Sequence, residues 1–401
     1  MAQRGAARYA MFGLLYFSQG TILSYFTALN GLYFLSRGLS MTDVGIFASI
    51  ALIPFVVKVF FGMLSDQVNL FGLGHRKPYI LLGLLVQTLC LVVVPFIDPG
   101  TAYWSFVAVA FVLQMGMALY DTCTDGLALD TTQENEKGTI QMFMVGGRAL
   151  GVVITSLVVG LIAEKISWAA VFWLLALFTV VPIPLVLRMR EADRPVERTF
   201  DWSAFGAFKS GIVIALAALG FVFFFIIAGA NQLVNPFLEA EYGISLTQAG
   251  LYTAVWGIGV VLGSIVGGRL IDRIGDRRAT WVSLGIALAG TLVLALTSGP
   301  AMAWVVVALF GLAYGTYQTV YFALAMAHTD PRIAASMFSI LMAVTNVAQG
   351  AGMGVSGVLA DSAGFRWTFV LLAVLNVLAI PLMPAVFGRQ KPTAAARGAG
   401  A

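Results

Sequence analysis

Apolar windows of about 20 residues recur along nearly the whole sequence, and each is long enough to cross a bilayer as a helix. Only 10% of the 401 residues are charged, against about 25% in soluble domains, so a soluble core cannot hide this much apolar surface. No long stretch shows the alternating segments of about 10 residues that are typical of membrane barrels. We therefore predict an all-α integral membrane protein.

The windows predict twelve transmembrane helices in two bundles of six. They fall near residues 9–35, 44–66, 78–97, 103–129, 140–163, 169–188, 210–236, 247–271, 279–298, 301–327, 334–360 and 367–387. The longest polar connector joins the sixth and seventh windows, so we expect an N-terminal bundle over residues 1–190, a cytoplasmic linker over 191–209 and a C-terminal bundle over 210–401. The first apolar run lacks a small-residue cleavage site, and we expect it to be a span rather than a signal peptide.

The distribution of basic residues predicts the orientation. With both termini on one side, that side collects most of the 23 lysines and arginines, whereas the opposite loops carry Arg37, Lys165 and Arg366. This bias is typical of a cytoplasmic face, so we expect a multi-pass protein of a bacterial-type inner membrane with both termini cytoplasmic. It also explains the pI of about 9.1, and we expect no nucleic-acid partner.

A short pattern ends the second and eighth spans, about half the chain apart. Each copy places a glycine four residues before an aspartate and is followed by basic residues. The glycine lets helices approach closely, and the acid can pair with a base or cap a helix N-terminus at the membrane surface. We assign a conformational role to both copies, which comprise Gly62, Asp66, Arg76, Lys77, Gly268, Asp272, Arg273 and Arg277.

The second copy, Gly268-Arg-Leu-Ile-Asp272-Arg273-Ile-Gly275-Asp-Arg277-Arg278, resembles the loop motif of the major facilitator superfamily. The resemblance implies two pseudo-symmetric six-helix bundles around a central cavity that opens alternately to each side. It implies that spans one, four, seven and ten line this cavity.

Within that superfamily, the N-terminal half resembles the muropeptide permeases and their relatives, the acetyl-coenzyme A transporters, the folate–biopterin transporters and some siderophore importers. The resemblance rests on Lys58, on the loop from Asn69 to Tyr79, and on the stretch from Asp121 to Asp130. Bacteriochlorophyll-delivery proteins share a similar start of span three, Arg76-Lys-Pro-Tyr79, so a non-transporting delivery role stays open.

Four charged residues interrupt the apolar windows of the first half: Lys58, Asp121, Asp125 and Arg148. Charges inside spans are costly and usually face a protein interior or water, and all four fall in the cytoplasmic half of their spans. They form either a structural ion-pair network or a set that exchanges partners as a carboxylate gains and loses a proton. Such an exchange is possible because burial raises a carboxyl pKa and a nearby cation lowers it. Our hypothesis pairs Asp125 with Arg148 as a gate, and Asp121 with Lys58 for coupling or substrate charge.

The spans that the resemblance places on the cavity carry amides and phenols. Such groups serve either as hydrogen-bonding contacts between helices or as substrate contacts. Aromatic faces with amides suit an amphipathic organic solute. The candidate cavity residues are Gln19, Asn30, Asn231, Gln232, Asn235, Tyr314, Tyr317, Gln318 and Tyr321.

Other classes are disfavoured. No phosphate-cradling loop or nucleophile–histidine arrangement is visible, and the cysteines and histidines are scattered, so we expect no enzyme, cofactor or metal site. The leading hypothesis is a monomeric secondary transporter that takes up an amphipathic organic anion with protons by alternating access. The alternatives are a pigment- or cofactor-delivery protein and a proton-driven efflux pump.

Overall fold

A computed structural model describes residues 2–131, 137–189, 191, 206, 209–327 and 334–388. These ranges are helical throughout apart from short connectors, and no strand occurs in them. The linker predicted over 191–209 lies outside them except for Glu191, Gly206 and Lys209.

In the first half, each apolar window forms a helix or a pair of helices. The elements are α1 (Ala2–Ala28), α2 (Asn30–Ser36), α3 (Met41–Gln67), η1 (Leu70–Gly72), α4 (Lys77–Val93), η2 (Val94–Phe96), α5 (Tyr103–Thr131), α6 (Lys137–Lys165), α7 (Trp168–Val180) and α8 (Ile183–Arg188). A break at Leu29 divides the first window, and Pro182 stands at the start of α8 where the sixth window divides. Pro184 follows in the first turn of α8, where a proline fits because a first-turn N–H has no partner within the helix.

The second half has the same plan. Its elements are α9 (Gly211–Tyr242), α10 (Leu246–Ala295), α11 (Pro300–Ala327), α12 (Ala334–Ala363), α13 (Phe365–Leu375), η5 (Asn376–Leu382) and α14 (Met383–Phe387). Helix α10 contains two predicted spans, and it is broken at Gly275, whose φ of 76° belongs to the left-handed region. A side chain strains that backbone conformation, so glycine suits the break.

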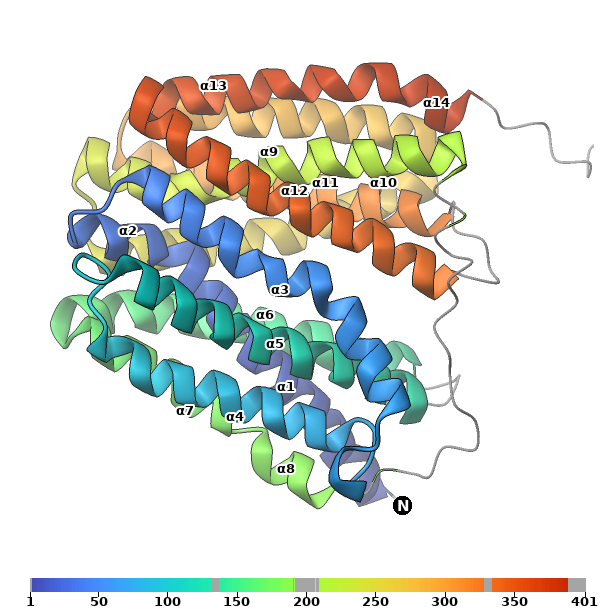
Figure 1. Cartoon of the computed structure of the whole chain (residues 1–401). Coiled ribbons are helices and arrows are strands. Elements are labelled where there is room, and N and C mark those ends of the chain that lie inside the picture. Colours follow the sequence, from blue (N-terminus) through green and yellow to red (C-terminus); the bar gives the residue numbers. More distant parts are fainter. Residues whose placement is uncertain are drawn as a thin grey trace, which may run out of the picture.

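Ten stretches of these helices are long and apolar enough to cross a membrane by length and composition. Helices α1 and α12 complete the two bundles, which lie one above the other in Figure 1. In the first bundle α1 packs on α6 and α4 on α5, and in the second α12 packs on α9 and α11 on α10. We call the membrane face at Ala2 the N-side and the opposite face the far side.

A seam on the far side joins the bundles. Helix α3 packs there against α12, and α6 packs against α10. Glycines bring the backbones together, since a Cβ at Gly45 would lie 2.6 Å from the carbonyl oxygen of Met353. The Ser49 hydroxyl donates to the carbonyl of Gly350 over 2.6 Å. The bundles therefore meet tightly at the end where α3 begins and α12 finishes.

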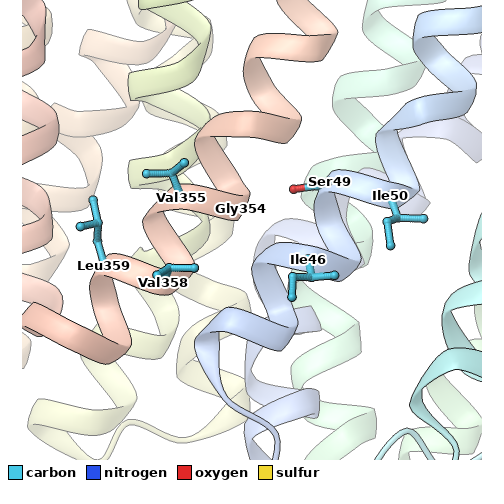
Figure 2. Close-up of a pocket in the computed structure, with 7 residues that line it drawn as sticks. All are labelled: Ile46, Ser49, Ile50, Gly354, Val355, Val358 and Leu359. Carbon is cyan, nitrogen blue, oxygen red and sulfur yellow. The ribbon is translucent and has the colours of Figure 1, made fainter.

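An apolar hollow of about 400 Å³ lies beside this seam (Figure 2). It is lined by Ile46, Ser49, Ile50, Gly354, Val355, Val358 and Leu359. Its walls come from α3 and α12 and carry no charge, so the hollow is separate from the charged residues of the first bundle.

Candidate functional site

Lys58 and Asp121 form an ion pair inside the first bundle. Lys58 Nζ on α3 lies 3.1 Å from Asp121 Oδ2 on α5, and their side chains are 30% and 10% exposed. The Gln19 amide on α1 donates to the other oxygen, Oδ1, over 2.7 Å. Both oxygens of Asp121 therefore have a partner, and three helices meet at this carboxylate. Opposite charges that meet in this way cost far less than isolated ones.

Asp125 lies one helical turn further along α5. It accepts a hydrogen bond from the Tyr16 hydroxyl on α1. Tyr16 precedes Gln19 by one turn, so two polar side chains of α1 face two carboxylates of α5. Tyr16 was not among the residues predicted from the sequence, although a phenol three residues before a glutamine in an apolar helix shares its face and was a usable signal.

Arg148 does not form the expected pair with Asp125. Within the described ranges its guanidinium makes no ion pair or hydrogen bond, and the residue is exposed. It still lies close enough to act electrostatically on Lys58, Asp125 and Tyr16. The pairing hypothesis is therefore corrected, because Asp125 accepts from Tyr16 with one oxygen and neither of its oxygens pairs with the guanidinium of Arg148.

Close packing of α6 on α1 places Arg148 beside the carboxylates. Gly147 faces the backbone of Gly13, and Gly151 faces the backbone of Phe17 and Gly20, with no room for a Cβ at either glycine. These contacts bring the backbones of the two helices together. The position of Arg148 thus follows from the glycines on either side of it.

Tyr314 of α11 faces this group from the second bundle. Arg148 acts on Tyr314 electrostatically across the bundle boundary. Tyr314 packs edge-on against Trp256 of α10, with ring centroids 5.2 Å apart. The buried indole N–H of Trp256 has no acceptor among the described residues. Trp256 was not among the residues predicted from the sequence, since a lone tryptophan in an apolar span carries no positional signal.

Two other tyrosines expected at the cavity are buried inside the second bundle. Tyr317 donates to Asn376 Oδ1 over 3.0 Å and stacks on Phe223, and Tyr321 donates to the carbonyl of Leu216 over 3.3 Å. Helical spacing placed them on one face with Tyr314 and Gln318, but that face covers an arc of about 100°. One edge of the arc packs into the bundle, so the structure gives Tyr317 and Tyr321 packing roles, whereas Gln318 is partly exposed.

The candidate amides divide in the same way. Gln232 donates to the carbonyl of Met353 over 2.9 Å, and Asn235 donates to Thr253 Oγ1 and to the carbonyl of Ala28 in the other bundle, each over 2.9 Å. These two hold helices together. Asn231 is partly exposed, and the side-chain oxygen of the buried Asn30 has no donor among the described residues.

The first loop copy joins several elements on the N-side. Arg76 is buried and donates to the Ser65 hydroxyl. The Lys77 ammonium donates to the carbonyls of Leu187 and Met189 over 2.7 and 3.0 Å. Glu191 accepts from the backbone N–H groups of residues 75, 76 and 77 at 2.9–3.0 Å. The start of α4 is thus capped by a carboxylate that the sequence analysis did not single out.

The acids of the two loop copies are Asp66 and Asp272, and their side chains lie outside the described ones. Gly62 packs on α5, where its Cβ would lie 3.3 Å from Thr122. Gly268 faces open space instead. Arg273 and Arg277 are exposed beside the break at Gly275. The two copies therefore pack differently in this conformation.

Comparisons with known proteins give one consistent family. The model of the Major Facilitator Superfamily matches residues 10–340 and 233–400. The chain is 23% identical over 385 residues to the anhydromuropeptide permease of Escherichia coli strain K12, covering 92% of this chain and 77% of that protein.

Solved structures agree on the fold. A bacterial homolog of the human lysosomal transporter Spinster, in an inward-facing and occupied conformation, superposes with a TM-score of 0.79 at 17% identity and covers 94% of this chain and 95% of that one. A D-xylose-proton symporter superposes with a TM-score of 0.74 at 16% identity and covers 95% and 98%.

Proposed function

The chain belongs to the major facilitator superfamily, and from that premise we propose that it imports an amphipathic organic anion together with a proton. Its family makes it a multi-pass membrane transporter of small solutes rather than an enzyme. The choice of an anion and a proton is supported by one observation, a cluster of two carboxylates and two cations within the spans of the first bundle.

In this proposal Asp125 carries the proton. Asp121 is held by the Lys58 ammonium and the Gln19 amide, so a proton there has to displace a cation. Asp125 uses one oxygen for the Tyr16 hydroxyl, and its other oxygen accepts no hydrogen bond from the described residues. That oxygen offers a place for a proton without breaking the ion pair.

Charge balance couples the proton to the anion. With both carboxylates ionised, the cluster of Lys58, Arg148, Asp121 and Asp125 is formally neutral. A proton on Asp125 leaves it with one positive charge, and an anionic group bound at Arg148 restores neutrality. A net charge within the membrane is costly, so each of the two ligands favours binding of the other.

The anion binds at the exposed guanidinium of Arg148. A planar guanidinium can donate two parallel hydrogen bonds to one carboxylate or phosphate, whereas an ammonium acts as a point charge. Tyr314 and Trp256 supply an aromatic wall from the second bundle. An amphipathic solute placed there touches both bundles, and its binding can therefore change their relative position. This arrangement suits a solute with one anionic group and an apolar or aromatic body.

Rocking of the two bundles moves the solute across the membrane in this proposal. The far side is closed here by the seam of α3 with α12, so the charged group is reached from the N-side. The excess of basic residues on the N-side supports a cytoplasmic assignment for it. The conformation then corresponds to the release of solute into the cell.

Uptake by proteoliposomes tests the proposal. Thermal-shift screening of organic anions, beginning with anhydromuropeptides and with D-xylose as a neutral control, first identifies a ligand, since a true substrate stabilises its binding state. An imposed inward proton gradient should then accelerate uptake by the native protein and by the loop variant Asp98→Asn. Asp125→Asn should bind ligand and lose the response to the gradient. Equal acceleration in Asp125→Asn contradicts the proposal.

A further inference from the structure

Helix α3 begins on the far side with its first N–H groups satisfied from two sources. The Ser40 hydroxyl accepts from Asp43 N within the same helix start. The remaining N–H groups of the first turn, those of Met41 and Thr42, donate to the Asp361 carboxylate over 3.1 and 2.6 Å. Asp361 belongs to the last turn of α12, in the other bundle. The start of α3 is therefore capped across the bundle boundary.

Helix α10 begins in the same way, but here the helix start belongs to the second bundle and the carboxylate to the first. The Ser245 hydroxyl accepts from Gln248 N, and the N–H of Thr247 donates to Glu164 Oε2 over 3.1 Å. Glu164 lies in the last turn of α6, in the first bundle. Helices α3 and α10 occupy equivalent places in the two halves, and so do α12 and α6. The two contacts are thus a symmetric pair, in which each bundle supplies one carboxylate and one helix start.

We propose that Asp361 and Glu164 form a latch that holds the far side closed. The latch belongs to the rocking motion described above and rests on that part of the proposed function. It adds two gate residues that lie far from the charged cluster. When the bundles separate on the far side, each helix start loses its carboxylate, and each carboxylate loses the positive end of a helix dipole.

The exposure of both carboxylates makes the latch reversible. Asp361 and Glu164 are exposed residues at helix ends, so water can replace each contact when it opens. Loss of a helix cap changes an equilibrium about five-fold, and two independent caps change it about 25-fold. That range biases a two-state protein without freezing it.

Distance measurements between spin labels test the latch without any ligand. Cysteines are introduced at Thr101 and Ser298, two exposed far-side positions in different bundles, in a background lacking Cys90 and Cys123. The labelled protein is placed in lipid nanodiscs, and the distance distribution gives the ratio of far-side-closed to far-side-open molecules. Asp361→Ala and Glu164→Ala are compared with Glu241→Ala, whose carboxylate pairs with Arg366 over 3.2 Å within one bundle.

Each latch variant should lower the closed-to-open ratio about five-fold, and the double variant about 25-fold. Glu241→Ala should leave the ratio unchanged. If an alanine variant does not fold, Asp361→Asn and Glu164→Gln keep the side-chain shape and remove the charge, and should shift the ratio in the same direction. Distributions that match the Glu241→Ala control in the single and double latch variants overturn the proposal. The experiment measures a distance in the absence of ligand. Its result therefore does not depend on whether the solute is an anion, nor on whether the coupling ion is a proton.

Discussion

Replacing Lys58 by methionine isolates the energetic role of the intramembrane ion pair. Asp121 is 10% exposed and lies 3.1 Å from the Lys58 ammonium, so the variant leaves a carboxylate without its cation inside the bundle. Removing one partner of a buried pair costs about 3–5 kcal/mol. We therefore expect a large loss of stability in thermal unfolding, followed by the fluorescence of the 8 tryptophans.

Arg37 and Asp98 provide a matched surface pair in the same bundle. They lie 3.4 Å apart, with side chains 38% and 44% exposed, and an exposed pair contributes about 0–1 kcal/mol. Arg37→Met should therefore lower the unfolding temperature far less than Lys58→Met does.

A second substitution separates charge from packing. Asn at position 121 keeps an acceptor for Gln19 and removes the unpaired charge, so Lys58→Met with Asp121→Asn should recover most of the lost stability. Equal destabilisation by Lys58→Met and Arg37→Met, or no recovery in the double variant, refutes the argument from burial.

Three further substitutions test other parts of the site. Arg148→Met should weaken anion binding about 10- to 100-fold, as loss of a hydrogen bond to a charged group does, while the unfolding temperature stays near that of the native protein; calorimetry of binding that shows native affinity counts against the anion site. Tyr317→Phe should lower stability by about 1 kcal/mol without changing ligand affinity. A loss of ligand binding without a loss of stability would instead indicate that Tyr317 lines the cavity. Glu191→Ala should cost about 0.5–2 kcal/mol, because the start of α4 loses its cap, and an unchanged melting curve contradicts that role.

The sequence predicted the helices well because a bilayer imposes length and apolarity on every span. All of the predicted windows coincide with helices, although their ends differ by several residues. Helix α9 continues through Pro236 to Tyr242, beyond the predicted end at 236. A proline inside a span is tolerated because neighbouring groups satisfy the freed carbonyl, and this compensation cannot be seen in one sequence.

The charged residues could be predicted as a group but not as pairs. Depth along each helix showed that Lys58 and Asp121 can meet, and they do. Asp125 and Arg148 also lie at depths where they can meet, but in the structure Tyr16 of α1 binds Asp125 instead. Rotation about a helix axis depends on packing between helices, here on glycines such as Gly147 and Gly151, and apolar windows carry no information about it.

The cross-bundle caps of Asp361 and Glu164 show the same limit. In the sequence each is an ordinary acid at the end of a span, and its partner lies in the opposite half of the chain. Only the placement of the bundles relative to one another identifies these contacts.

Proton uptake on ligand binding tests the central claim most directly. Purified protein in weak buffer with a pH indicator is mixed with the anion that the thermal-shift screen identifies, at a pH where Asp125 is ionised without ligand. We predict that the native protein takes up one proton for each anion bound, that Asp98→Asn does the same, and that Asp125→Asn binds the anion without proton uptake. Full proton uptake by Asp125→Asn, or anion binding to the native protein without a proton, would contradict the account.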